Sequence, residues 1–174
     1  ALDTSMGFTP LAGVMMGTRS GDIDASLVAF LAEKLQKTMP EMITILNNNS
    51  GLLGISELSP DQRDLEQTQA DRPKSKLALD MFVSRVVQYV GSYIAELGGV
   101  DAIVFTAGSG ENGIEMRQVI ADKLAYFGIA IDPTKNDCRG KERVVSPEGS
   151  PVQALVVPTN EELMIVRDVT RLTT

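Results

Sequence analysis

The stretch Asp101-Ala-Ile-Val-Phe-Thr-Ala-Gly-Ser-Gly-Glu-Asn-Gly113 carries the pattern that decides the fold. Its first half contains a short apolar run, Ala102 to Phe105, bounded by turn signals, which predicts a buried parallel strand. A glycine loop follows, and Asn112 is predicted to cap a helix that runs to about Phe127. A second apolar run, Ala154 to Val157, predicts another buried strand. The pattern therefore indicates an α/β fold in which helices cover parallel strands.

Most of the sequence before this stretch has helical periodicity. The strongest helix is predicted from about Lys74 to Leu97, where apolar residues at helical spacing form one continuous stripe that Gly98-Gly99 ends. By contrast, residues 2–21 are predicted to be strand and loop, and Ser50 to Ile55 is too rich in glycine to predict a helix. Shorter helices are predicted after Asp22 or Asp24, from Thr38 to before Gly51, and as one turn after Ser59-Pro60.

The C-terminal part has a less regular pattern. Ile129 to Ile131 is a candidate short strand, and the charged segment that follows predicts no regular element. Thr159-Asn160 is predicted to cap the last helix, whose apolar face consists of Leu163, Val166 and Val169 or Thr170. Neither a repeat nor a linker interrupts the chain, so we expect a single domain over residues 1–174.

Composition excludes several classes of protein. With 43% apolar and 22% charged residues, the chain resembles an ordinary globular domain rather than a disordered chain or a coiled coil. No apolar stretch approaches the roughly 20 residues that a membrane-spanning helix needs. The N-terminus also lacks the basic and apolar regions of an export signal. We therefore expect no membrane association and a cytoplasmic location.

Charge and residue content narrow the chemistry further. The formal net charge of −7 argues against nucleic-acid binding, because such proteins neutralise phosphates with clustered lysines and arginines. The chain has no histidine and a single cysteine, Cys138, which excludes an internal disulfide, most zinc sites and nucleophiles that depend on histidine. Catalysis would rest on carboxylates, arginines, lysines, backbone amides and a metal held by oxygen ligands.

The glycine loop Gly108-Ser-Gly-Glu-Asn-Gly113 matches the G-x-G-x-x-G pattern of dinucleotide-binding proteins, and Asp132 follows about 20 residues later. Spacing alone leaves three interpretations open. The backbone amides could contact a nucleotide, the loop could bind a dinucleotide, or the segment could be a simple turn from strand to helix. Because only one convincing strand follows the loop, the dinucleotide interpretation is disfavoured.

Arg19 lies between two glycines in Gly17-Thr-Arg-Ser-Gly21, where the backbone is free to approach a ligand closely. A guanidinium group there suits a carboxylate, or the oxygens of a phosphoryl group in transfer. The alternative is a surface arginine paired with Asp22 or Asp24. The sequence pattern alone does not choose between them.

Two polar segments open predicted helices. Glu161 and Glu162 follow a buried strand, and one of them could bind Mg²⁺ directly or through water. The alternative is that they interact favourably with the dipole of their helix. Asp61-Gln62-Arg63 likewise either contacts a ligand or forms a solvated first turn. The cluster from Arg139 to Arg143 is interpreted as a solvated loop without a function.

Taken together, five segments resemble the acetate kinase family, which also includes propionate and butyrate kinases. The resemblance extends over nearly the whole chain. It rests on the five segments occurring in the same order as in the family, rather than on the spacing within any one segment. The segments are Asp3 to Leu11 with Met16-Gly-Thr-Arg-Ser-Gly-Asp-Ile-Asp24, Ser50-Gly-Leu-Leu-Gly54, Asp61-Gln-Arg-Asp64, Phe105-Thr-Ala-Gly-Ser-Gly-Glu-Asn112 and Pro158-Thr-Asn-Glu-Glu-Leu163.

The resemblance implies a ribonuclease-H-like fold of the actin, Hsp70 and sugar kinase superfamily. It also implies the reversible reaction of acetate with ATP to give acetyl phosphate and ADP, with Mg²⁺. In that reaction Arg19 would stabilise the transferred phosphoryl group and orient the carboxylate, and Glu161 would bind Mg²⁺. The nucleotide would contact Asp61, Gln62, Arg63, Gly108, Ser109, Gly110, Glu111 and Asn112. A homodimer is expected, because the family dimerises through its C-terminal domain.

Some features depart from the family. Ser109 replaces the usual isoleucine, and Ala12 and Ala25 stand where glutamate and proline are common. The resemblance also places an N-terminal domain, a catalytic aspartate, an acetate-contacting arginine and a histidine-containing phosphate loop before this sequence begins. We therefore expect a C-terminal nucleotide-binding domain that is inactive alone and whose sheet has an exposed edge. The alternatives are a nucleotide-binding or dimerisation module without catalysis, a propionate or butyrate kinase, and a dinucleotide-dependent oxidoreductase.

Overall fold

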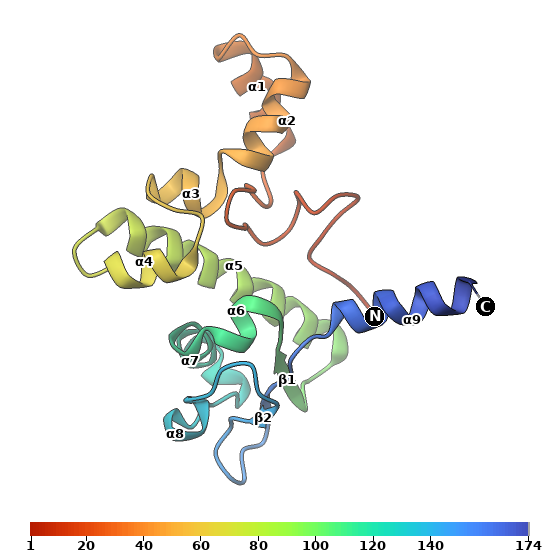
Figure 1. Ribbon diagram of the computed structural model, residues 1–174. Helices are drawn as coiled ribbons and strands as arrows, with labels where there is room; N and C mark the ends of the chain where they lie inside the picture. The colour runs from red at the N-terminus through yellow and green to blue at the C-terminus, as the bar shows by residue number, and fades with distance from the viewer. Residues whose placement is uncertain (174) are drawn as a thin grey trace. The chain divides into compact units, whose positions relative to one another are not determined.

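A computed structural model describes residues 1–173 (Figure 1). The chain divides into two compact units, an N-terminal unit, Ala1–Leu97, and a C-terminal unit, Gly98–Thr174. The N-terminal unit is built from helices and the C-terminal unit combines helices with a small sheet, so the predicted α/β class is confirmed. The assignment of residues 1–174 to one domain of a larger kinase stays a prediction.

The N-terminal unit contains only helices and irregular turns. Its first 24 residues form turns, so the strand predicted within residues 2–21 is absent. Figure 1 shows α1 and α2 side by side, and Val28, Ala32, Met42 and Leu46 form the buried cluster between them. The helices are α1 (Ala25–Lys34), α2 (Met39–Asn48), α3 (Gly51–Ser56), α4 (Gln62–Thr68) and α5 (Pro73–Leu97).

Three of these helices form where the sequence predicts them. Asp24 caps α1 by accepting a hydrogen bond from the N–H of Ser26 at 2.7 Å. Thr38 and Glu41 form a capping box at the start of α2. Helix α5 packs against α3 and α4, and Gly98 follows its last residue with a φ of 71°. The apolar stripe of α5 is confirmed in part, because Leu79, Val83 and Ile94 are buried whereas Leu97 is exposed.

Helix α3 contradicts the prediction that Ser50 to Ile55 is too rich in glycine for a helix. The cause is a tertiary contact, because the carbonyls of Met16 and Gly17 accept hydrogen bonds from Leu52 and Leu53 at 3.0 and 2.8 Å. These bonds satisfy amides that a helix leaves unpaired at its start. Gly51 has a φ of 61°, and a Cβ there would lie 2.2 Å from the Met16 carbonyl oxygen. The chain therefore needs glycine at the point where α3 begins.

The sheet of the C-terminal unit has three strands in the order β1-β3-β2. Strand β1 (Ala102–Phe105) pairs in parallel with β3 (Gln153–Val156), and β2 (Arg143–Val144) pairs with β3 in an antiparallel arrangement. The predicted second strand forms as the central β3, with Ala154 and Val156 buried. The prediction that β1 is buried is wrong, because β1 is an edge strand and Val104 is 52% exposed. The exposed sheet edge itself is confirmed.

This unit differs from prediction in several places. Asn112 ends one helix and does not cap the next, whose N-cap is Gly113, and the charged segment predicted to be irregular contains a short helix and a short strand. The segment Ile129 to Ile131, a candidate strand, is a loop in which both isoleucines are buried, and the next residue, Asp132, donates its N–H to the Val145 carbonyl at 2.8 Å. Helix α9 forms where predicted, yet it contains no buried residue, so its apolar face is exposed. The other helices are α6 (Ala107–Asn112), α7 (Ile114–Lys123), the 3₁₀ turn η1 (Ala125–Phe127) and α8 (Pro133–Asn136); α9 spans Glu161–Thr173.

Within residues 1–173, we find no helix that is both long enough and apolar enough to cross a membrane.

Candidate functional site

The segment around Arg19 is held in place by its backbone. Arg19 accepts a hydrogen bond on its carbonyl from the N–H of Met16 at 3.0 Å, and Ser20 donates its N–H to Leu46 at 2.9 Å. Thr18 donates its hydroxyl to the Asn47 carbonyl at 2.8 Å, at the end of α2. The segment is therefore fixed on α2 by Thr18 and Ser20.

The side chain of Arg19 lines an open polar hollow of about 490 Å³. Its guanidinium donates a weak hydrogen bond to the sulfur of Met16 at 3.4 Å. In the described part of the chain Arg19 makes no ion pair, so the alternative of a surface pair with Asp22 or Asp24 is wrong. The hollow is lined by Met16, Gly17, Thr18, Arg19, Ile43, Thr44, Asn47 and Asn48.

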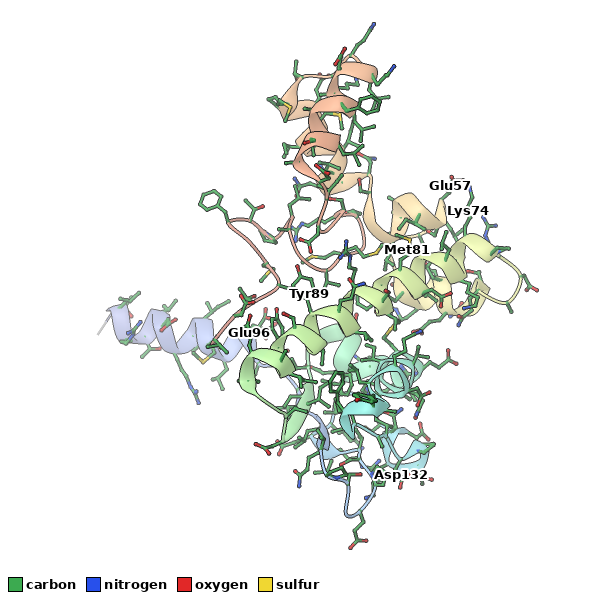
Figure 2. All side chains as sticks on the ribbon, turned by 180° about the vertical axis from the view of Figure 1, so that it is seen from behind. Glu57, Lys74, Met81, Tyr89, Glu96 and Asp132 are labelled. Carbon is green, nitrogen blue, oxygen red and sulfur yellow. The ribbon has the colours of Figure 1, made fainter. Side chains whose placement is uncertain are left out.

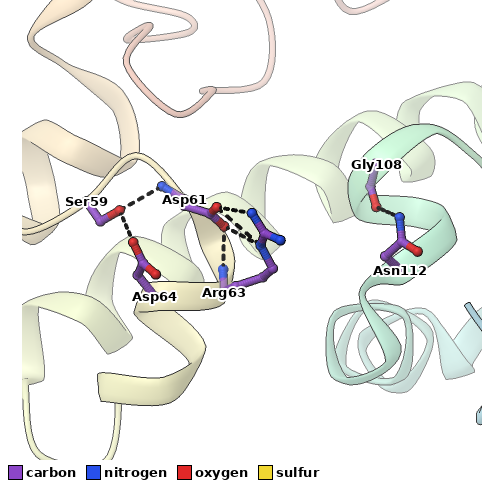
Figure 3. A network of polar contacts seen from close by, with 6 residues as sticks. All are labelled: Ser59, Asp61, Arg63, Asp64, Gly108 and Asn112. Carbon is purple, nitrogen blue, oxygen red and sulfur yellow. Dashed lines mark hydrogen bonds and ion pairs between the residues drawn. The ribbon is translucent and has the colours of Figure 1, made fainter.

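The predicted contact segment Asp61-Gln62-Arg63 forms the start of α4 (Figure 3). Asp61 caps the helix by accepting from the N–H of Arg63 at 2.9 Å, and the Arg63 guanidinium binds the same carboxylate at 2.5 Å. The hydrogen bonds from Arg63 lower the pKa of Asp61 to about 2. Because the Arg63 side chain is 78% exposed, this pair is open to solvent, as the alternative of a solvated first turn requires.

The glycine segment is a short helix and not the loop that the sequence predicts. Helix α6 follows β1 directly, and Asn112 donates its side-chain amide to the Gly108 carbonyl at 3.1 Å (Figure 3). A Cβ at Gly110 would lie 2.9 Å from the carbonyl carbon of Phe105. Glycine at position 110 therefore lets the helix turn back tightly against the strand that precedes it.

Glu111 ties α6 to the residues after β3. Thr159 donates both its N–H and its hydroxyl to one Glu111 oxygen, at 2.8 and 3.0 Å. These hydrogen bonds hold the pKa of Glu111 below its usual range. Because β1 and β3 are parallel, their carboxyl ends lie at the same end of the sheet. Helix α6, which contains the predicted nucleotide residues Gly108 to Asn112, and Glu161, the exposed first residue of α9, both follow strands at that end.

Glu161 does not form a metal cluster with other side chains. Among the described residues, no group of three or more acidic or cysteine side chains could hold a metal ion. Mg²⁺ is often bound through one or two carboxylates, with water and substrate phosphates as its remaining ligands. The single exposed carboxylate of Glu161 fits that mode of binding and does not fit a metal site made by protein ligands alone.

Arg117 is a buried residue that the sequence analysis missed. Its side chain is fully enclosed, and its five N–H groups donate to neutral oxygens. The acceptors are Gly110 O at 2.8 Å, Glu111 O at 3.0 Å, Asn136 Oδ1 at 2.7 Å, Asn136 O at 2.8 Å and Cys138 O at 2.9 Å. Burial lowers the pKa of this guanidinium. The sequence did contain a signal for this burial, because Arg117 lies at helical spacing from Ile114, Ile120 and Leu124. A charged residue on an apolar helix face is expected to be buried with hydrogen-bond partners.

A family model described as the Acetokinase family matches residues 1–167. Acetate kinase 1 of Latilactobacillus sakei is 68% identical over 172 residues, covering 99% of this chain and 44% of that protein. Acetate kinase of Limosilactobacillus fermentum is 60% identical over 173 residues, again covering 99% of this chain and 44% of that protein. The chain therefore spans about 44% of the length of these curated relatives.

Solved structures of kinases from this family are also similar to this chain over less than half of their own length. Porphyromonas gingivalis acetate kinase matches with a TM-score of 0.90 at 40% identity, covering 98% of this chain and 43% of that one. A propionate kinase from Francisella tularensis matches with a TM-score of 0.86 at 43% identity, covering 94% of this chain and 42% of that one. The predicted fold class is confirmed.

Proposed function

We propose that this chain, which belongs to the acetokinase family, is the nucleotide-side part of an ATP-dependent carboxylate kinase. The reaction transfers the terminal phosphoryl group of ATP to acetate, reversibly, and gives acetyl phosphate and ADP. One oxygen of the carboxylate forms a bond to phosphorus while the bond from phosphorus to the bridging oxygen of ATP breaks. High identity to proteins named acetate kinase supports this assignment.

The observation that carries the proposal is the guanidinium of Arg19, which makes no ion pair within residues 1–173 and borders a polar hollow. Phosphoryl transfer spreads negative charge over three equatorial oxygens, and positioned cations stabilise that charge. The planar guanidinium can donate to two oxygens at once. Arg19 would therefore hold the transferred group and orient the attacking carboxylate.

The other predicted residues would contact the nucleotide. Helix α6 offers backbone close to the sheet edge, where Ser109 and Gly110 would approach the adenosine part of ATP. Arg63 would exchange Asp61 for an oxygen of the nucleotide, because their pair is exposed and so costs little to open. Glu161 would hold Mg²⁺ directly or through water. Bound with ATP, that ion neutralises charge on the phosphates.

We further propose that the 174-residue chain does not turn over alone, because it spans only about 44% of its relatives. The complete kinase would act in the cytoplasm as a homodimer.

Two assays on two proteins test these proposals. The first protein is the 174-residue chain, and the second is a completed kinase in which this chain replaces the matching stretch of the Latilactobacillus sakei relative. With acetate, ATP and hydroxylamine, only the completed kinase should form acetyl hydroxamate. If it forms none, although it folds and binds ADP in calorimetry, the kinase assignment is wrong and a nucleotide-binding module replaces it. Tighter binding of NAD than of ADP would instead support a dinucleotide-dependent protein.

The likeness to a propionate kinase favours a second candidate substrate. The ratio of kcat/KM for propionate to that for acetate, measured in the completed kinase and in its unmodified parent, shows what this chain contributes. An equal ratio would place the choice of substrate outside these residues, and a ratio shifted toward propionate would support the second candidate.

A further inference from the structure

The carboxylate of Asp22 connects the arginine segment to α5. One of its oxygens accepts a hydrogen bond from the N–H of Gly13 at 2.8 Å, and the other accepts from the hydroxyl of Tyr89 at 2.5 Å. Figure 2 shows Tyr89 on α5, beside the N-terminal segment. The two residues lie 67 positions apart in the sequence, so this contact is a tertiary one.

The first of these bonds closes a loop. Asp22 also donates its N–H to the Gly13 carbonyl at 3.0 Å, so the two ends of residues 13–22 are paired in both directions. Gly13 and Gly21 have φ angles of 98° and 72°, and a Cβ at Gly21 would lie 2.6 Å from the Gly13 carbonyl oxygen. The closed loop is therefore tight, and Arg19 lies within it.

The second bond fixes this loop on a long helix. Arg19 has no ion pair of its own in the described structure, and its one side-chain bond is the weak contact with Met16. The region that its guanidinium can reach therefore depends on where the backbone that carries it lies. That backbone is held on α2 by the bonds of Thr18 and Ser20, and on α5 by Tyr89 through Asp22.

We propose that Tyr89 is a positioning residue for phosphoryl transfer, which acts on Arg19 through Asp22 and the loop 13–22. The inference rests on the proposed function of Arg19. Tyr89 does not touch the reacting atoms, so its effect reaches them only by fixing where the guanidinium lies. The strength of the hydrogen bond agrees with this role, since it lowers the pKa of Asp22 and raises the pKa of Tyr89 to about 12.

A double-mutant cycle in the completed kinase tests the proposal. The variants are Tyr89→Phe, Arg19→Ala and the pair, with Tyr93→Phe as the control, because Tyr93 lies one turn further along α5 with ring centroids 6.0 Å apart. Tyr89→Phe should lower kcat by about 10- to 100-fold, since a misplacement on the order of 1 Å can cost that much. KM for ATP should stay within about twofold, because binding of the ground state is not affected.

The decisive comparison is between the effect of Tyr89→Phe on kcat in the otherwise unmodified completed kinase and its effect in the Arg19→Ala variant. In the Arg19→Ala background Tyr89→Phe should lower kcat no further, because the residue through which it acts is gone. An unchanged kcat in Tyr89→Phe alone, or an equal loss in both backgrounds, would overturn the inference. Should Arg19→Ala itself leave kcat unchanged, the proposed function fails instead, and the two failures are thus distinguishable. If Tyr89→Phe does not fold, Asp22→Asn replaces it in the same cycle with the same expected results.

Discussion

Arg19 in the N-terminal unit and Arg117 in the C-terminal unit differ in what meets their guanidinium groups. Five protein oxygens accept from Arg117, and its side chain is fully enclosed. Arg19 has a sulfur atom as its side-chain partner and borders an open hollow. A buried cation must have its donors satisfied by the protein, whereas a cation that binds a ligand needs donors left over. The comparison separates a structural arginine from a functional one.

The same difference extends to the segments around them. In the N-terminal unit, backbone groups hold the arginine segment together with the Thr18 hydroxyl and the Asp22 carboxylate, and glycines permit its tight turns. In the C-terminal unit side chains hold α6, through Arg117 at its last carbonyls and Glu111 on Thr159. The tight turns of the first segment are therefore tested by substituting a glycine, and the hold on α6 by substituting a side chain that bonds to it.

The largest effect on stability is expected from Gly51→Ala. The new Cβ would lie 2.2 Å from the Met16 carbonyl oxygen at a φ of 61°, so α3 and the arginine segment must move apart. We expect a loss of about 4 kcal/mol in the free energy of unfolding by urea. Gly91→Ala in α5 is the matched control, because nothing lies within 4 Å of its Cβ, and it should stabilise by about 0.5 kcal/mol. Similar midpoints for the two variants would contradict the packing described for α3.

The second-largest loss of stability is expected from Arg117→Met. It removes five donors, so that the buried carbonyls of Asn136 and Cys138 and the part-buried carbonyl of Gly110 lose their arginine partner, which should cost about 3 kcal/mol. Arg117→Lys should lie between this variant and the unmodified chain, because lysine has three donors. The control is Arg171→Met on exposed α9, which should change stability by less than about 0.5 kcal/mol. If Arg117→Met unfolds at the same urea concentration as the control, Arg117 does not hold α6.

The smallest effect is expected from Glu111→Gln, and it should depend on pH. The pKa of Glu111 is lowered in the folded chain, so its bonds to Thr159 stabilise the fold above the ordinary pKa of a glutamate. That contribution is lost as pH falls through the lowered value. The difference in Tm between the unmodified chain and Glu111→Gln should therefore be present at pH 7 and shrink below about pH 4. A difference that stays constant or grows on acidification would show that the charge of Glu111 does not make this bond.

The sequence predicted the elements whose signals are local. The apolar stripe of α5, the caps Asp24 and Thr38 and the buried β3 need only neighbouring residues to be recognised. Helices α3 and α6 were missed because their glycine content lowers helix propensity, and the contacts that compensate come from Met16, Gly17 and the close approach to Phe105. Those contacts join residues far apart in the chain or depend on backbone geometry.

The residues of the candidate site were likewise predicted only in part from the sequence. The resemblance named Arg19 and Glu161, but no sequence pattern indicated that the guanidinium of Arg19 would be unpaired, or that Asp22 would bind Tyr89 instead. Arg63 is paired with Asp61, which no sequence pattern indicated, and its contact with nucleotide stays a prediction. Which donors remain free is a property of the packed structure, since every nearby acceptor competes for them.

The kcat of Arg19→Ala in the completed kinase tests the central claim most directly. Because an arginine that stabilises phosphoryl transfer contributes about 1,000-fold or more, kcat should fall by that factor. The unfolding midpoint should not change, since Arg19 makes no ion pair that the fold requires. A kcat within about twofold of the unmodified completed kinase would contradict the claim that Arg19 is the phosphoryl clamp.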